Sequence, residues 1–272
     1  MGRNIYYCSK CNNYVNLNLL IEGVEDMKDI AKEFMEFTKY KYLGESDQSL
    51  GLPQPPAEAA YDLGRQKISL PSPNTLPLGK VALIDAINMR RSLRNFPDKA
   101  MTTEELSFLL WCTQGVKKSK SDSSSVLRTV PSAGARHAVE TYLLINNVDG
   151  LEAGLYRYLA FEHKLILMDD NAGIAEKITA ACLGQGMVGR CAVGFFWAAE
   201  ADRMTWRYDT RGYRYLHLDA GHVCQNLYLA AESIDCGACA IGAYDDDELN
   251  GLLGLDGENR FIIYSAVVGK RG

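Results

Sequence analysis

The sequence lacks the features that mark several classes of protein. No apolar run in its 272 residues approaches the roughly 18 residues that a membrane-spanning helix needs. The N-terminus has no charged segment followed by an apolar one, which is the pattern of a secretory signal. The formal net charge of −5 leaves no basic surplus for the phosphates of a nucleic acid. We therefore expect a cytoplasmic protein that binds neither membranes nor nucleic acids.

Patterns for disulfides and metals are also scarce. The eight cysteines fall largely in apolar stretches, as buried reduced thiols do, and a chain of this length needs no disulfide scaffold. Cys8 and Cys11, and also Cys236 and Cys239, have the spacing of zinc ligands. The second pair lies in a predicted strand, where side chains three apart point to opposite faces. We predict no metal site, and a metal-dependent protein that uses these thiols stays a minor alternative.

Proline is concentrated in one part of the chain. Six of the eight prolines fall within residues 44–79, which we interpret as an extended connector. An amphipathic helix is predicted before it, over residues 26–42. The apolar residues of this helix recur at spacings of three and four: Met27, Ile30, Phe34 and Phe37. The sequence thus predicts an N-terminal extension, residues 1–77, and a main domain, residues 78–272.

Helix and strand patterns alternate irregularly through the main domain. Helices are predicted over 80–90, 103–114, 171–183, 213–234 and from Asp245 onward, and strands over 139–148, 154–158, 165–168, 191–199, 236–243 and 261–268. Thr102 with Glu105, and Asp245 with Glu248, have capping-box spacing. Residues 116–130, rich in Ser and Lys, are predicted to be a loop. Because no regular βαβ rhythm is present, we expect a layered α+β domain.

One segment has an unusual density of guanidinium groups. Arg90-Arg91-Ser92-Leu93-Arg94 follows the predicted helix at 80–90 and places three arginines within five residues. Arginine presents a planar fork of donors that suits a phosphate. On spacing alone, a solvated basic turn is the favoured interpretation.

Two further segments combine small residues with turns. In Pro131-Ser132-Ala133-Gly134-Ala135-Arg136-His137, proline fixes the entry and the small residues allow a planar ligand to approach the backbone. In Ala240-Ile241-Gly242-Ala243-Tyr244-Asp245, a small-residue strand ends where a capped helix begins, and backbone amides at such a junction can contact an electron-rich ring. Each segment alone is also consistent with an ordinary turn.

Taken in order, the three segments resemble the FMN-dependent nitroreductase superfamily, in its subgroup of SagB-type dehydrogenases, which form thiazoles and oxazoles in peptides. Gly154-Leu155-Tyr156-Arg157-Tyr158 and Asp219-Ala220-Gly221-His222 resemble stretches typical of that subgroup. The likeness runs from about Asp85 to Lys270. It implies a nitroreductase-like fold, with a mixed or antiparallel central sheet flanked by helices, and a homodimer of the domain-swapped kind.

The resemblance also implies roles for the arginine segment and for the C-terminal part of the chain. Arg90, Ser92 and Arg94 would hold the FMN phosphate and ribityl chain, with Arg91 close by. Ile241 and Gly242 would present backbone near the flavin N5. Lys270, near the end of the chain, would reach the phosphate.

The segment at 131–137 would serve the flavin of the partner subunit. Pro131, Ser132 and Ala133 would approach the isoalloxazine ring, so that the sites lie at the interface of a homodimer. Ala135 stands where many nitroreductases have Asn, so one ring contact is either absent or made by Arg136 or His137. Tyr213 and Arg214 are candidates for the substrate side, and no catalytic side chain is assigned.

The expected activity is transfer of hydride equivalents between a reductant such as NAD(P)H and a small organic acceptor, or dehydrogenation in the SagB-type direction. A flavin-binding scaffold without turnover is the alternative. Gly184-Gln185-Gly186-Met187-Val188-Gly189 matches a dinucleotide-binding pattern, but it follows a predicted helix and precedes a strand, which is the wrong context. We interpret it as a plain loop.

Overall fold

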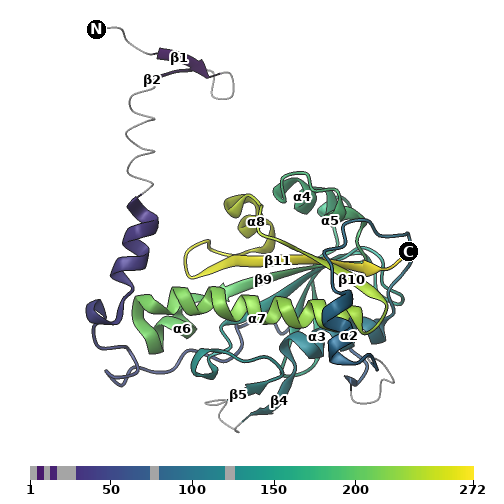
Figure 1. Cartoon of the computed structure of the whole chain (residues 1–272), viewed down its shortest axis with the longest axis horizontal. Helices are drawn as coiled ribbons and strands as arrows, with labels where there is room; N and C mark the ends of the chain where they lie inside the picture. The colour runs from purple at the N-terminus through teal and green to yellow at the C-terminus, as the bar shows by residue number, and fades with distance from the viewer. Residues whose placement is uncertain (1–4, 9–12, 17–28, 74–79, 120–125) are drawn as a thin grey trace. The chain divides into compact units, whose positions relative to one another are not determined.

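The computed structural model describes the chain except residues 1–4, 9–12, 17–28, 74–79 and 120–125 (Figure 1). The chain divides into two units, Met1–Glu45 and Ser46–Gly272. In the first unit, β1 (Ile5–Cys8) pairs antiparallel with β2 (Asn13–Asn16). Residues 29–37 are helical, and a 3-10 turn, η1 (Tyr40–Tyr42), follows. Cys11, of the first cysteine pair, lies outside the described residues.

The helix predicted over 26–42 is shorter than expected in the described part. Its predicted apolar residues Ile30, Phe34 and Phe37 are exposed, and Met27 falls outside the described residues. No described helix of either unit is both long and apolar enough to cross a bilayer.

The second unit is built on a seven-stranded sheet in the order β10-β11-β9-β6-β7-β8-β3. Its strands are β3 (Lys67–Ser69), β6 (Val139–Ile145), β7 (Gly154–Leu159), β8 (Lys164–Asp169), β9 (Val193–Glu200), β10 (Cys236–Ile241) and β11 (Arg260–Lys270). Every neighbouring pair is antiparallel, so the α+β prediction is confirmed with an antiparallel sheet. β10 and β3 are the two edges.

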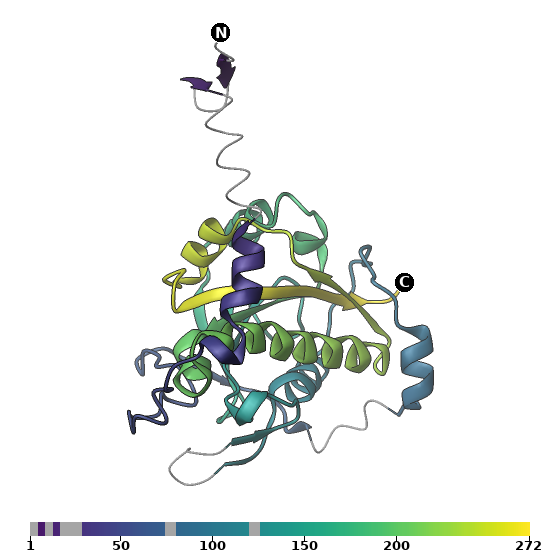
Figure 2. The same ribbon diagram turned by 60° about the vertical axis from the view of Figure 1, so that its left-hand side comes forward.

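Helices cover both faces of this sheet (Figures 1 and 2). One face packs against α3 (Thr103–Gln114) and the long α7 (Gly212–Glu232), with α2 (Leu83–Met89) beside α7. The other face packs against α4 (Ile174–Ala181), α5 (Met187–Arg190) and α8 (Asp246–Leu253). α6 (Ala201–Tyr208), which the sequence did not indicate, joins β9 to α7 through the short turn η4 (Asp209–Arg211). The core therefore lies in two layers, one on each side of the sheet.

Successive side chains of β10 alternate between these two layers. Cys236 and Ala238 pack in the layer of α3 and α7, whereas Cys239 and Ile241 pack in the layer of α8. The prediction that Cys236 and Cys239 face apart is confirmed. Within the described residues, no group of His, Cys, Asp and Glu side chains is arranged to hold a metal ion.

Residues 44–79 differ from the predicted connector. The division of the chain falls at Glu45/Ser46, not near Leu78, and β3 forms an edge of the central sheet by pairing with β8. Before it, residues 46–60, which we name the strap, run along the main unit: Trp206 Nε1 donates to the Leu52 carbonyl at 2.9 Å. The prolines suppress regular structure in the strap, but they do not prevent packing.

Two local predictions are also corrected. The predicted loop at 116–130 contains a hairpin, β4 (Val116–Ser119) paired with β5 (Val126–Arg128). At α8, the Asp245 side chain accepts the Glu248 N–H at 3.0 Å, but the reciprocal bond of a capping box is not formed. At α3, by contrast, Thr102 and Glu105 make both bonds, as predicted.

Candidate functional site

The arginine segment lies along the free edge of the sheet. α2 ends at Met89, and the chain then continues beside β10. The Leu93 N–H donates to the Ala238 carbonyl at 2.9 Å, and Ser92 forms a parallel bridge to the same residue. Because β10 is an edge strand, its outer side can take this pairing, which fixes the backbone of the segment.

Tyr228 of α7 is the residue that joins the segment to the helix beneath it. Its hydroxyl lies 3.0 Å from Ser92 Oγ and accepts the Ala240 N–H at 2.7 Å. The Arg90 guanidinium carbon lies 5.3 Å from the centre of the Tyr228 ring, a cation–π contact. Sequence reasoning missed Tyr228, because its partners are far from it along the chain and only the fold brings them together.

The three arginines carry positive charge that no carboxylate of the described residues pairs with. Arg91 and Arg94 are exposed and Arg90 is half-buried. Among the residues that the structure describes, none of the three forms an ion pair with a carboxylate. A fixed backbone that presents uncompensated guanidiniums fits a phosphate, which takes charge-assisted hydrogen bonds from them.

Ile241 and Gly242 lie at the end of the same strand. Ile241 is buried, and its carbonyl accepts from Ser265 Oγ at 2.9 Å. Gly242 is exposed, and a Cβ added to it would meet no atom within 4 Å. The backbone at Gly242 is therefore open to a planar group. The structure thus places two of the three predicted segments at β10, one beside the strand and one at its end.

Lys270 is already engaged within the chain. It ends β11 opposite Cys236, is largely buried, and its Nζ donates to Glu105, the residue that also caps α3. A phosphate contact by Lys270 would have to compete with this ion pair. The predicted role of Lys270 thus has less support from the structure than that of the arginines.

The segment at 131–137 is anchored to α7 at a different turn. The Ala133 N–H donates to Asp219 Oδ1 at 3.1 Å, and Ser132 Oγ accepts the His137 N–H at 2.8 Å. Asp219 is buried, its Oδ2 has no partner among the described residues, and burial raises the pKa of its carboxyl. Asp219 and Tyr228 are nine residues apart on α7, about 14 Å along its axis. Their separation keeps this segment away from the arginine segment of the same chain.

His137 and Arg136 are both buried at the end of that segment. His137 Nε2 lies 3.1 Å from the Val126 carbonyl, and burial lowers the pKa of His137 to about 3, so the ring is neutral near pH 7. Arg136 Nε donates to the Gly134 carbonyl at 3.1 Å, and its guanidinium carbon lies 5.3 Å from the Trp206 ring centre. The ring N–H of His137 is thus already used in a hydrogen bond within the chain.

Tyr213 and Arg214 lie in the first turn of α7. The Tyr213 ring stacks on Phe261 with centres 6.4 Å apart and planes 6° from parallel. Tyr213 belongs to the same apolar cluster as Ala133, so both lie at the α6 end of the helix. Within one chain these two residues accompany the 131–137 segment and not the arginine segment.

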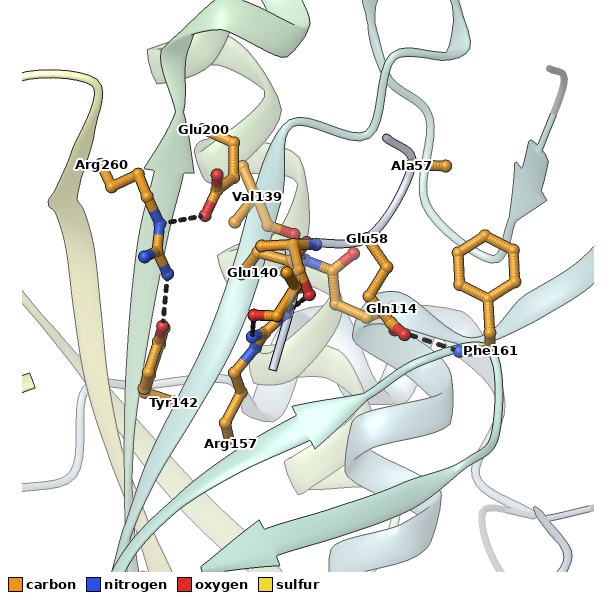
Figure 3. Close-up of polar contacts among 12 residues, drawn as sticks. Ala57, Glu58, Gln114, Val139, Glu140, Tyr142, Arg157, Phe161, Glu200 and Arg260 are labelled. Atoms are coloured by element: carbon orange, nitrogen blue, oxygen red, sulfur yellow. Dashed lines mark hydrogen bonds and ion pairs between the residues drawn. The ribbon is translucent and has the colours of Figure 1, made fainter. Parts of the chain in front are cut away.

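A buried charge cluster connects this segment to the strap, and sequence reasoning missed it. Glu140 of β6 accepts from Arg203 at 2.8 Å and accepts the Ala59 N–H at 3.0 Å. It also lies 3.5 Å from Arg157 (Figure 3). Burial raises the pKa of Glu140, but the arginines more than offset this and hold it at about 2. Glu140 is therefore a buried anion at physiological pH.

The arginines of this cluster hold backbone on either side. Arg157 donates to the Ala59 and Ala60 carbonyls at 2.6 and 2.9 Å, which clamps the strap. Arg203 donates to the His137 carbonyl at 2.9 Å, which holds the 131–137 segment. A second ion pair nearby joins Arg260 to Glu200 at 2.9 Å (Figure 3). Arg157, in the Gly154–Tyr158 stretch, thus holds the backbone of the strap.

Comparison with known proteins agrees with this arrangement. A nitroreductase family protein of Methanocaldococcus jannaschii is 34% identical over 175 residues, which are 64% of this chain and 85% of the relative. The trifolitoxin-processing protein TfxB of Rhizobium leguminosarum bv. trifolii is 31% identical over 109 residues, 39% of this chain and 29% of TfxB. The latter similarity accords with the predicted subgroup.

Solved structures show the same fold. A nitroreductase structure from Ralstonia eutropha has a TM-score of 0.63 at 26% identity and covers 81% of this chain and 95% of its own. One from Anabaena variabilis has a TM-score of 0.62 at 27% identity and covers 79% of this chain, which spans only 45% of that longer protein. A Desulfovibrio desulfuricans nitroreductase in complex with FMN shares the fold, with a TM-score of 0.51 at 16% identity over 71% of this chain and 88% of its own.

The model of the nitroreductase family matches residues 87–270, from the end of α2 to the last residue of β11. This range includes the arginine segment, the 131–137 segment and Gly242. The chain belongs to the nitroreductase family.

Proposed function

We propose that this protein is a homodimeric FMN-dependent oxidoreductase. It would move hydride equivalents between a reductant such as NAD(P)H and a small organic acceptor, or dehydrogenate a substrate in the SagB-type direction. The observation that carries the proposal is the uncompensated arginine segment on the edge of β10, beside the open backbone at Gly242. Family membership and the FMN complex of the Desulfovibrio relative support the same cofactor.

The residues present fit FMN. Arg90, Arg91 and Arg94 would bind the phosphate, and the open backbone at Gly242 would lie against the ring. When bound, FMN would supply the hydride-accepting and hydride-donating chemistry. The chain's own task is then to hold and orient: Tyr228 fixes Ser92 and Ala240 relative to each other. No proton-transferring side chain is assigned.

The distance between the two parts of the site supports the proposed homodimer. In one chain, the 131–137 segment and the arginine segment contact turns of α7 about 14 Å apart. A second copy would bring its 131–137 segment to the arginine segment of the first. Each site would then take its phosphate contacts from one subunit and a ring contact from the other.

The first test is the cofactor itself. The purified protein, incubated with FMN and then desalted, should be yellow and should release FMN on denaturation at about one per chain. An Arg90→Ala, Arg94→Ala double variant should lose most of this flavin while its circular dichroism stays unchanged, because Arg94 is exposed and Arg90 is only half-buried against the Tyr228 ring. Lys99→Ala with Arg190→Ala, which removes two exposed cations elsewhere, is the matched control. Full flavin retention by the first variant would refute the assignment.

Turnover separates the enzyme from the flavin-binding scaffold. The flavin-loaded protein should oxidise NADH or NADPH in the presence of quinone or nitroaromatic acceptors. Firm FMN binding without turnover over a broad panel of donors and acceptors would support the scaffold instead.

A further inference from the structure

We propose that Arg136 and Arg207 form a subsite for an oxyanion, either a carboxylate or a phosphate. The proposed function gives this subsite its role, because it places the 131–137 segment beside the flavin of the partner subunit. Binding of the oxyanion itself does not depend on that function. The subsite comprises the turn at Gly134, the guanidinium of Arg136 and the last residues of α6, which are Trp206, Arg207 and Tyr208.

The first support is an uncompensated buried charge. Arg136 is 8% exposed and forms no ion pair with any described carboxylate. Burial, and then the positive charge of Arg207, lower the pKa of Arg136. The nearby Arg203 is also positive, and its own partner is Glu140. A buried guanidinium surrounded by like charges is costly unless an anion completes the site.

The second support is an unused donor. Arg136 Nη1 is buried and has no hydrogen-bond partner among the described residues, whereas Nε is taken by the Gly134 carbonyl. Buried polar groups are nearly always paired. A water molecule would satisfy this hydrogen bond, but it would leave the charge of Arg136 and Arg207 unbalanced. An oxyanion would satisfy both.

The third support is the way in which the turn closes on α6. Gly134 has a φ of 55°, and a Cβ at this position would lie 2.5 Å from Tyr208 Oη and 2.9 Å from Arg207 Cδ. Glycine therefore lets the turn pack directly against these two side chains. Within the described part of the chain, neither the Arg207 guanidinium nor the Tyr208 hydroxyl makes a hydrogen bond, so both are available as donors.

Aromatic rings hold the two guanidiniums. The guanidinium carbon of Arg136 lies 5.3 Å from the Trp206 ring centre, and that of Arg207 lies 5.6 Å from the Tyr208 ring centre. Cation–π contacts of this kind restrict the guanidiniums, which favours two-point recognition of a carboxylate or phosphate. Arg136 is buried and Arg207 is exposed, so the anion would enter from the Arg207 side.

Equilibrium binding tests the subsite without turnover. In isothermal titration calorimetry at constant ionic strength, benzoate and inorganic phosphate are the anionic probes and benzamide is the neutral one. The wild-type protein should bind at least one anion saturably and should bind benzamide at least about tenfold more weakly, as expected when charge-assisted bonds are lost. Arg136→Met and Arg207→Gln should each weaken anion binding by about tenfold or more. Arg190→Gln, which removes an exposed arginine on α5, should leave it unchanged.

Kinetics then distinguish the two sources of the anion. If it is a carboxylate of the acceptor, Arg207→Gln should raise KM for 4-nitrobenzoate but not for 4-nitrobenzamide. If it is a phosphate of the reductant, the same variant should raise KM for NADPH or NADH with either acceptor. Either outcome supports the subsite and identifies its ligand.

Three results would overturn the proposal. One is the absence of saturable anion binding in the wild type, and another is equal affinity for benzoate and benzamide. The third is an equal loss of binding in Arg190→Gln. If Arg136→Met misfolds, Arg207→Gln still tests the subsite, because the Arg207 side chain is exposed and its replacement should not disturb the fold. Because FMN retention is measured separately, loss of the subsite and failure of the proposed function remain distinguishable.

Discussion

Glu140 shows how much the fold depends on single buried charges. Its carboxylate is 2% exposed and is stabilised by arginines from β7 and α6 and by a backbone N–H of the strap. Removing one partner of such a cluster leaves the others buried and uncompensated. The cost is therefore much larger than the loss of a surface ion pair.

Glu140→Gln should lower the free energy of unfolding by about 3–5 kcal/mol. The neutral amide keeps an oxygen for the Ala59 N–H but leaves Arg203 and Arg157 without a counter-charge. Urea denaturation measures the effect. Glu200→Gln, which removes a half-buried carboxylate with Arg260 as its partner, is the control and should cost clearly less. Equal costs would contradict a central role for Glu140.

His137 should make stability depend on pH. Burial lowers its pKa from 6.5 to about 3, so the folded state holds the neutral ring while the unfolded state takes up a proton below about pH 6.5. This contribution is complete above pH 6.5 and is lost as the pH falls toward 3. Thermal or urea unfolding between pH 7 and 4.5 should show a decline that is shallower in His137→Gln. Glu140 adds to the decline only as the pH falls through about 4.5, the pKa of a Glu in the unfolded state, toward its folded pKa of about 2.

At the scale of elements, the helix caps offer a direct comparison. Thr102→Ala removes one bond of a reciprocal capping box, and Asp245→Ala removes a single side-chain cap. Each substitution should cost about 0.5–2 kcal/mol. The loss should be larger at α3, because Glu105 also binds Lys270 and depends on the same geometry. Paired urea titrations of the two variants measure the difference, and a larger loss at α8 would contradict this ranking.

The elements with strong local signals were predictable, and those that depend on distant partners were not. α3 was predicted to the residue, because Thr102 and Glu105 mark its start. β3 lies among prolines and pairs with residues almost a hundred positions away, so local pattern could not reveal it. The buried face of α6 includes the charged Arg203, so the sequence shows no continuous apolar face for this helix. Only the fold reveals that Glu140 lies beside Arg203 and pairs with it.

The same limit applies to the candidate site. The arginine segment and Gly242 were visible as a local density of one residue type and as a small-residue junction. Tyr228 and Asp219 were not assigned roles, since their partners Ser92 and Ala133 are joined to them only by the packing on α7. Clusters of functional residues that are close in sequence can be recognised from the sequence. The side chains that position them can be identified only from tertiary contacts.

At the scale of the whole molecule, the proposed homodimer predicts both mass and complementation. Analytical ultracentrifugation should give about twice the chain mass of 30.1 kDa. A variant of the arginine segment and a variant of Asp219, each inactive alone, should recover about a quarter of wild-type activity when co-expressed at random. Half of such dimers would be mixed, and each mixed dimer would have one intact site. A monomeric protein, or no recovery, would contradict a shared site.

The clamped strap has a consequence for biosynthesis. Arg157 binds the carbonyls of Ala59 and Ala60, but it is synthesised about a hundred residues after them. Trp206, which binds the Leu52 carbonyl, is synthesised about 150 residues after Leu52. A nascent chain must therefore keep this proline-rich stretch unattached until most of the sheet has been synthesised. Contacts of such long sequence separation slow folding. During that time the strap is exposed to proteases and to other chains.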